Sequence, residues 1–147
     1  MAITRQTPQV EISNTIVAST NNLNRAIIHS MEVAGQKGTN EARAHGEYTD
    51  QTGNLRSSTG YVISDDGVIK SSSSFDSVKN GSDGATQGKN IAKSIAGSIK
   101  GKKAIVLVAG MDYAPYLQAK GRKVMGDAED IINRSLTKQF NDLGLIK

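Results

Sequence analysis

One apolar face with helical spacing runs through the first quarter of the chain. Its positions recur at intervals of three, four or seven residues: Ile12, Ile16, Leu23, Ile27, Met31 and Ala34. This repeat predicts a long amphipathic helix, which needs the rest of the chain as a surface to pack on. Gly35 and Gly38 weaken the pattern, and residues 39–48 continue it less regularly. Residues 1–10 contain Pro8 and show no period, so we expect an extended N-terminal arm.

The middle of the chain changes from helical to strand patterning. Residues 57–63 and 68–75 are runs rich in β-branched residues or serine, and an Asp-Gly step lies between them, which is typical of a β-hairpin. A loop marked by Asp50, Gly53 and Asn54 precedes the hairpin. The stretch 80–88 is polar and rich in turn residues, and we expect it to be an exposed loop.

The second half of the chain predicts a helix and then a strand. Ile91, Ile95 and Ile99 lie four residues apart, which indicates an amphipathic helix of about three turns with this face turned to the protein. Gly101 is placed to end that helix. Residues 104–109 form a continuous apolar run, and we expect the most buried strand of the sheet there.

Two further helices complete the chain. Residues 112–121 predict a turn and a short helix, with Pro115 near its first position and Gly121 at its end. A last helix begins near Asp127, whose carboxylate we expect to cap it, and its apolar face comprises Ile132, Leu136, Phe140 and Leu143. The order of elements predicts a single α+β domain over residues 11–147, with a small, mostly antiparallel sheet.

Composition excludes several classes of site. The 147 residues include no cysteine, which excludes a disulfide framework, a thiolate zinc site and a cysteine nucleophile. No stretch approaches the roughly 18 apolar residues of a membrane span, and the first residues do not resemble a signal peptide. We therefore expect a soluble protein that is made in the cytoplasm and has no membrane partner.

The positive charge is concentrated in one segment. The chain has a formal net charge of +4, and its excess lies in residues 79–103, where Asp83 is the only acid among six lysines: Lys79, Lys89, Lys93, Lys100, Lys102 and Lys103. These lysines are either a solvated helix face or a strip that contacts nucleic-acid phosphates. No arginine or aromatic residue lies between them, so DNA contact here would be independent of sequence.

None of the familiar catalytic patterns is complete. Gly84, Gly88 and Lys89 resemble a phosphate-binding loop, but only three residues separate the glycines, and Asn90 replaces the hydroxyl that would hold magnesium. His29 and His45 are sixteen residues apart, outside any metal-binding motif. The acids at 127, 129 and 130 are expected from the helix dipole alone, and no serine lies in a nucleophile elbow. We therefore expect no enzymatic activity, no metal and no cofactor.

Two short motifs carry a resemblance to a known family. The run Thr52-Gly53-Asn54-Leu55-Arg56-Ser57-Ser58 follows the long helix, and Tyr113-Ala114-Pro115-Tyr116-Leu117 follows the apolar strand. Together, in this order, they resemble the signatures of the HK97 gp10-like family of tailed-phage neck and tail-completion proteins. The chain departs from that family at Gln118, Ala119 and Lys120, where the family usually has an acid, and in a lysine-rich insertion at about 76–103.

The resemblance implies a structural protein of the virion. Such a subunit would assemble in the host cytoplasm into a homo-oligomeric ring at the head-tail junction, as a neck connector or a tail-completion protein. Its partners would be further copies of itself, other portal, neck or tail proteins, and, through contact without sequence preference, the packaged DNA. The alternative from another class is a small nucleic-acid-binding protein that uses the lysine strip.

The motif residues also have a physical role of their own. Gly53 is suited to a positive φ between helix and sheet, Leu55 to an anchor in the core, and Arg56 to a forked charged donor. Tyr113 and Tyr116 lie three apart across a proline and are suited to packing as amphipathic plugs. These five residues either hold the sheet to the helices within one subunit or contact a neighbouring subunit.

Overall fold

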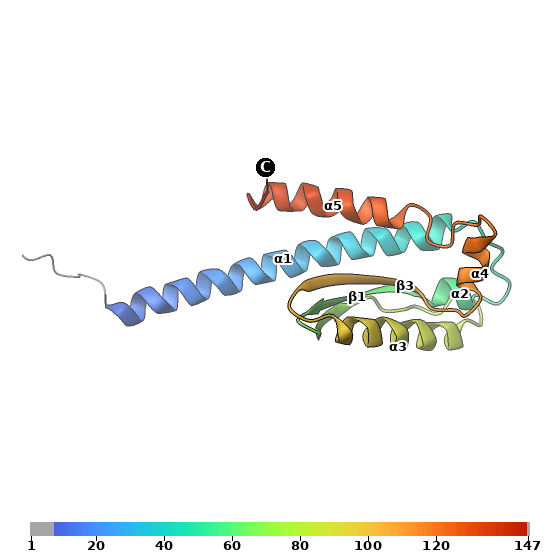
Figure 1. Cartoon of the computed structure of the whole chain (residues 1–147), viewed down its shortest axis with the longest axis horizontal. Coiled ribbons are helices and arrows are strands. Elements are labelled where there is room, and N and C mark those ends of the chain that lie inside the picture. Colours follow the sequence, from blue (N-terminus) through green and yellow to red (C-terminus); the bar gives the residue numbers. More distant parts are fainter. Residues whose placement is uncertain (1–7, 147) are drawn as a thin grey trace, which may run out of the picture.

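The computed structural model describes residues 8–146, which form three helix and sheet layers with a long projecting helix (Figure 1). The predicted α+β class is confirmed, with a three-stranded antiparallel sheet, a long N-terminal helix and a C-terminal helix. The elements in chain order are α1 (Gln9–His45), α2 (Asn54–Ser57), β1 (Thr59–Asp65), β2 (Val68–Ser72), α3 (Ser82–Ser98), β3 (Lys103–Ala109), α4 (Ala114–Ala119) and α5 (Ala128–Asp142).

The sheet has the strand order β2-β1-β3, so β1 lies at its centre. The predicted hairpin is confirmed: Asp66 and Gly67 form a two-residue turn with φ values of 52° and 80°, as the twist of a hairpin requires. The expectation that residues 104–109 form the most buried strand is wrong. Every residue of β1 except Asp65 is buried, whereas β3 pairs with β1 alone and is half-buried along most of its length.

Alternate residues of β1 enter two separate cores. Val62 lies with Val106 and Val108 on the face that α3 covers, and Phe75 packs there as well. Tyr61 and Ile63 point to the opposite face and pack with Met31 of α1. The two-residue period of a strand therefore explains why two helices that are distant in sequence cover opposite faces of one small sheet.

Helix α3 corrects two expectations. Residues 80–88 do not form an exposed loop, because α3 already begins at Ser82. The helix is buried along a stripe of small residues at intervals of four, Gly84, Gly88, Ala92 and Ala96, and not along its isoleucines. Ile91 and Ile99 pack at the margins of the core, but Ile95 is 43% exposed. Small side chains bring the helix backbone close to the sheet, so bulky ones fit only at the edges.

Helix α1 runs without interruption through the two glycines that weaken its sequence pattern. A Cβ on Gly35 would lie 2.8 Å from the Tyr61 ring, and one on Gly38 would lie 2.5 Å from the Ile132 side chain. These glycines therefore allow β1 and α5 to approach α1 closely. The less regular residues 39–45 complete the same helix, which ends before Gly46.

The last two helices follow the predicted positions. Pro115 lies in the first turn of α4, and Gly121 follows the helix with φ of 78°. Helix α5 packs along α1 (Figure 1), and its Leu136 packs against the cluster of Met31, Tyr61 and Ile63, so α5 also borders the sheet. The carboxylate of Asp127 does not cap α5 as expected; it accepts a hydrogen bond from Lys123 Nζ at 3.1 Å.

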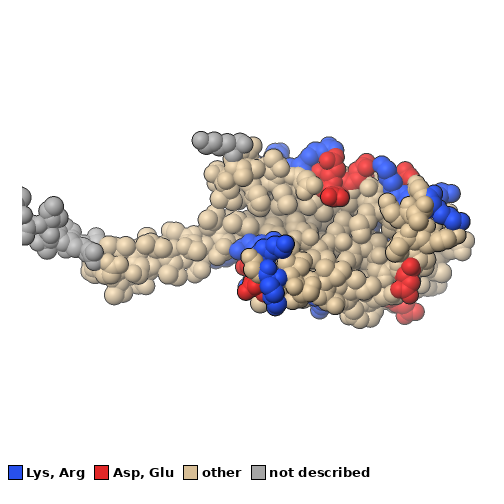
Figure 2. Space-filling model, in the orientation of Figure 1, with Lys and Arg blue, Asp and Glu red and all other residues tan. Residues whose placement is uncertain are grey.

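The first part of α1 projects beyond the rest of the molecule (Figure 1). Residues 9–24, here called the stalk, are exposed except for the half-buried Ile12. Charged side chains gather on the body, whereas the stalk shows none on the face drawn in Figure 2. Of the predicted extended arm, residues 1–7 lie outside the described residues, and Gln9 and Val10 belong to the helix. No helix among residues 8–146 is long and apolar enough to cross a membrane.

Candidate functional site: the junction of two motifs

The first motif forms the joint between α1 and the sheet. Gly53 has φ of 82°, which confirms the expected positive φ, and a Cβ at this position would lie 1.9 Å from the carbonyl oxygen of Val78. The expected loop is here a single helical turn, α2, which begins directly after Gly53. Glycine is therefore required at position 53 both by its backbone conformation and by lack of space.

Buried hydroxyls strengthen this joint from within and fasten it to two other segments. Ser57 Oγ accepts a hydrogen bond from the backbone nitrogen of Val78 at 2.7 Å. Ser58 Oγ donates to the carbonyl oxygen of Leu55 at 2.7 Å and accepts from the backbone nitrogen of Gly110 at 3.0 Å. Gly110 directly follows β3, so Ser58 links the first motif to the chain that leads into the second.

The structure brings the two motifs together although roughly 60 residues separate them in the sequence. Leu55 is 1% exposed, and it forms one apolar cluster with Ala114 and Val124, against which Leu117 packs. Leu55 therefore anchors the core as expected, and its partners Ala114 and Leu117 come from the second motif. This contact lies within one chain.

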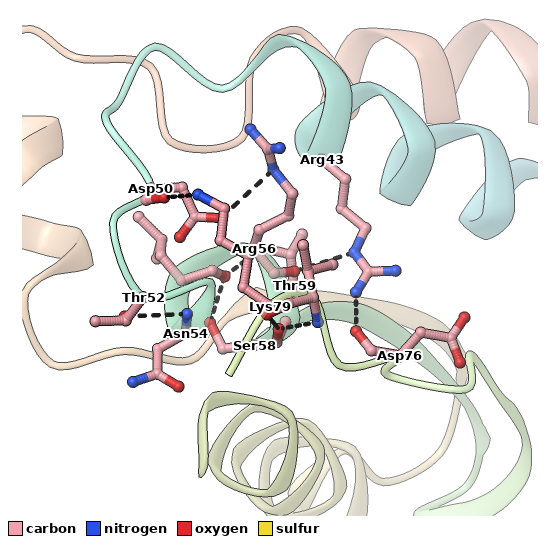
Figure 3. A network of polar contacts seen from close by, with 12 residues as sticks. Arg43, Asp50, Thr52, Asn54, Arg56, Ser58, Thr59, Asp76 and Lys79 are labelled. Carbon is pink, nitrogen blue, oxygen red and sulfur yellow. Dashed lines mark hydrogen bonds and ion pairs between the residues drawn. The ribbon is translucent and has the colours of Figure 1, made fainter. Parts of the chain in front are cut away.

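A small polar cluster lies beside this apolar contact (Figure 3). Arg56 Nε is 3.9 Å from Asp50 Oδ2, and the guanidinium lies 6.0 Å from the centre of the Tyr48 ring. The Asp50 side chain is only 5% exposed, whereas that of Arg56 is 34% exposed. Burial raises the pKa of Tyr48, and the nearby Arg56 charge acts in the opposite direction.

Three buried atoms of this cluster make no hydrogen bond with the described residues: Tyr48 Oη, Asp50 Oδ2 and Arg56 Nε. Around them, Arg43 donates hydrogen bonds to the carbonyl oxygens of Arg56 and Asp76, and Lys79 Nζ donates to that of Asp50 (Figure 3). These long cationic side chains tie the end of α1 and the chain after β2 to the motif. The cluster therefore supports the joint.

The two tyrosines of the second motif are not buried within the chain. Tyr113 is 41% exposed and Tyr116 is 58% exposed, so neither acts as a plug inside this subunit. Lys120 Nζ lies 4.7 Å from the centre of the Tyr116 ring, at the surface. Burial of part of its ring, and next the charge of Asp50, raise the pKa of Tyr113. Both aromatic rings thus offer exposed apolar surface beside α4.

The lysine strip is divided between two roles. Lys79 is held by the Asp50 carbonyl, and Lys103 Nζ lies 3.3 Å from Asp65 Oδ2 across the sheet. Lys89 and Lys93 stand on the exposed side of α3, and Lys100 and Lys102 follow in the exposed connection to β3. None of these four pairs with an acidic side chain in the part of the chain that the structure describes.

The other candidates from the sequence are not assembled into sites. Gly84 and Gly88 pack against the backbone of Asn54 and Ser58 and leave no space for a phosphate group between them. His29 and His45 are exposed and lie next to Glu32 and Glu41 on the same helix. Over residues 8–146, no three acidic or histidine side chains are placed to hold a metal ion.

Sequence reasoning missed the residues that build the joint. The stripe of small residues on α3 was visible as a spacing of four, but its glycines resembled a turn-rich loop. Ser58 and Gly110 carry no pattern that links them, because their contact depends on the three-dimensional arrangement alone.

None of the family models, curated proteins or solved structures compared with this chain matches it.

Proposed function

We propose that the chain is a structural protein of a tailed-phage virion and forms a homo-oligomeric ring at the head-tail junction. The observation that carries the proposal is the pair of family-like motifs, which occur in the expected order and pack on each other through Leu55, Ala114 and Leu117. The resemblance implies a neck connector or a tail-completion protein.

Two surface features support assembly. The stalk exposes apolar side chains, with Ile16 61% and Val17 58% exposed, and the second motif exposes Tyr116 at the opposite end of α1. Exposed aliphatic and aromatic groups at two separate places are what a subunit with two different neighbours requires, and closed rings are built from such unlike contacts.

The alternative function, a nucleic-acid-binding protein without sequence preference, is favoured by the unpaired lysines of α3 and its C-terminal connection. Light scattering and negative-stain imaging of the purified chain separate the two. Closed rings of one size support the virion protein. A monomer that binds DNA and releases it as salt is added supports the alternative.

A further inference from the structure

The stalk is a helix whose own residues do not stabilise it. Twelve of its sixteen residues are β-branched residues, serine or asparagine, which are weaker helix formers than alanine, leucine or glutamate. From Ile12 to Asn24 there is no charged side chain, so no ion pair supports this part. Short helices without tertiary contacts are marginal in water, so the stalk requires a partner.

The same residues indicate what kind of partner this is. Ile12, Ile16 and Leu23 continue the line of Ile27 and Ala34, the positions by which α1 packs inside the body. Thr15 and Thr20 donate their hydroxyls to backbone carbonyls one turn earlier, at 2.9 Å in both cases. The side of the stalk formed by Ile12, Ile16 and Leu23, here called the apolar stripe, is therefore largely nonpolar. It fits an apolar surface that carries little charge.

A surface of this kind lies at the free edge of the sheet. Helix α5 packs on α1, and between α5, α4 and β3 there is a groove of about 660 Å³. Its walls include Ile105, Leu107, Ala109, Ala114, Val124 and Ile132, and Glu129 is its one acidic or basic side chain. Exposed Tyr116 belongs to α4, the helix that closes one end.

The stalk and the groove correspond in length but cannot meet within one chain. Sixteen helical residues span about 24 Å, and the seven residues of β3 span nearly the same distance. The stalk points away from the body as part of one unbroken helix, and α4 lies at the other end of the molecule (Figure 1). A stalk that enters such a groove must therefore belong to another copy.

We propose that the stalk of one subunit lies in the groove between β3, α4 and α5 of the next subunit. This contact joins two different surfaces and can repeat from copy to copy until a ring closes, whereas stalk-to-stalk pairing would stop at two copies. The inference rests on the proposed function for the presence of identical neighbours, and it adds the surfaces by which they meet.

Engineered cysteines test this contact directly. Because the natural chain has no cysteine, every cross-link must join the cysteines that were introduced. Met125 also lines the groove, so the full chain carrying Ile16→Cys and Met125→Cys is treated with a short bis-maleimide, and the products are separated by denaturing electrophoresis. We expect a ladder of dimers, trimers and larger species. Each single variant, and the pair Ile16→Cys with Lys89→Cys on the opposite side of the sheet, should stay largely monomeric on the gel.

Other outcomes overturn the inference in distinguishable ways. Dimers from Ile16→Cys alone indicate stalk-to-stalk pairing, and a ladder from the Lys89 control indicates unspecific collision. If no ladder forms but light scattering still shows an oligomer, this contact is refuted and the proposed ring is not. A chain that is monomeric in light scattering refutes both the contact and the ring.

A matched pair of charge variants gives a second measurement. Ile16→Asp places a carboxylate in the apolar stripe, and Asn14→Asp adds the same charge on the other side of the stalk. We expect Ile16→Asp to raise the dissociation constant of the oligomer by about tenfold or more, and Asn14→Asp to change it by about twofold at most. Equal effects of the two variants would contradict the proposed orientation of the stalk.

Discussion

Replacing Gly53 by alanine is expected to destabilise the fold strongly, for two separable reasons. The backbone at φ of 82° disfavours any residue with a Cβ, by about 1 kcal/mol. The added methyl group would also lie 1.9 Å from the Val78 carbonyl oxygen. That carbonyl cannot move freely, because the backbone nitrogen of Val78 is held by Ser57 Oγ at 2.7 Å. Overpacking of this kind costs about 1–3 kcal/mol.

The two contributions give a loss of about 2–4 kcal/mol in the free energy of unfolding. In a domain of this size the midpoint of thermal unfolding should fall by roughly 5–15 °C, measured by circular dichroism. Gly121→Ala is the matched control, since Gly121 has φ of 78° but no atom within 4 Å of the added methyl group. We expect the control to lose only about 1 kcal/mol. If both variants lose the same amount, the steric argument is refuted.

Three further predictions concern α3, the tyrosines with a raised pKa, and the lysines. Gly88→Ala should lower the free energy of unfolding by about 1–3 kcal/mol, because its Cβ would lie 2.2 Å from the Ser58 carbonyl oxygen. Gly97→Ala has open space around it and should raise the free energy of unfolding by about 0.5–1 kcal/mol. Unfolding in urea measures both changes. Burial raises the pKa of Tyr48, Tyr61 and Tyr113, so the contribution of these three groups to stability should be constant below pH 10 and fall as the pH rises further. Tyr48→Phe should reduce that fall, and an unchanged profile would contradict the burial of Tyr48. Changing Lys89, Lys93 and Lys100 together to Gln should leave the free energy of unfolding within about 1 kcal/mol of that of the natural chain. The same change should impair assembly or DNA retention in particles. Particles that assemble and retain DNA normally would show that these lysines serve only solubility.

The sequence predicted those elements whose signal is local. The long helix, the Asp-Gly hairpin and the last helix were visible because spacing and turn chemistry operate over a few residues. The two errors on α3 have one cause. The buried side of α3 consists of glycine and alanine. In a sequence, glycines indicate a loop and alanines give no apolar signal, whereas the isoleucines, which do, lie beside the contact between α3 and the sheet. The small residues are selected by the close approach of two backbones, which only the fold reveals.

The candidate site was predicted in part for a similar reason. The positive φ of Gly53 and the burial of Leu55 follow from the residue types themselves. The contact of Leu55 with Ala114, and the link from Ser58 to Gly110, join segments far apart in the sequence, and no spacing predicts them. The exposure of Tyr113 and Tyr116 was likewise open, because an amphipathic side chain fits a core and an interface equally well.

Gold labelling of whole particles tests the central claim most directly. Antibodies against the purified chain would be applied to tailed-phage particles produced from a genome that encodes it, and the particles imaged by negative stain. The account predicts label at one position, between head and tail, on most particles. Absence of label from particles whose head-tail junction is accessible to antibody would contradict the account. Label spread along the tail or over the head would contradict it as well.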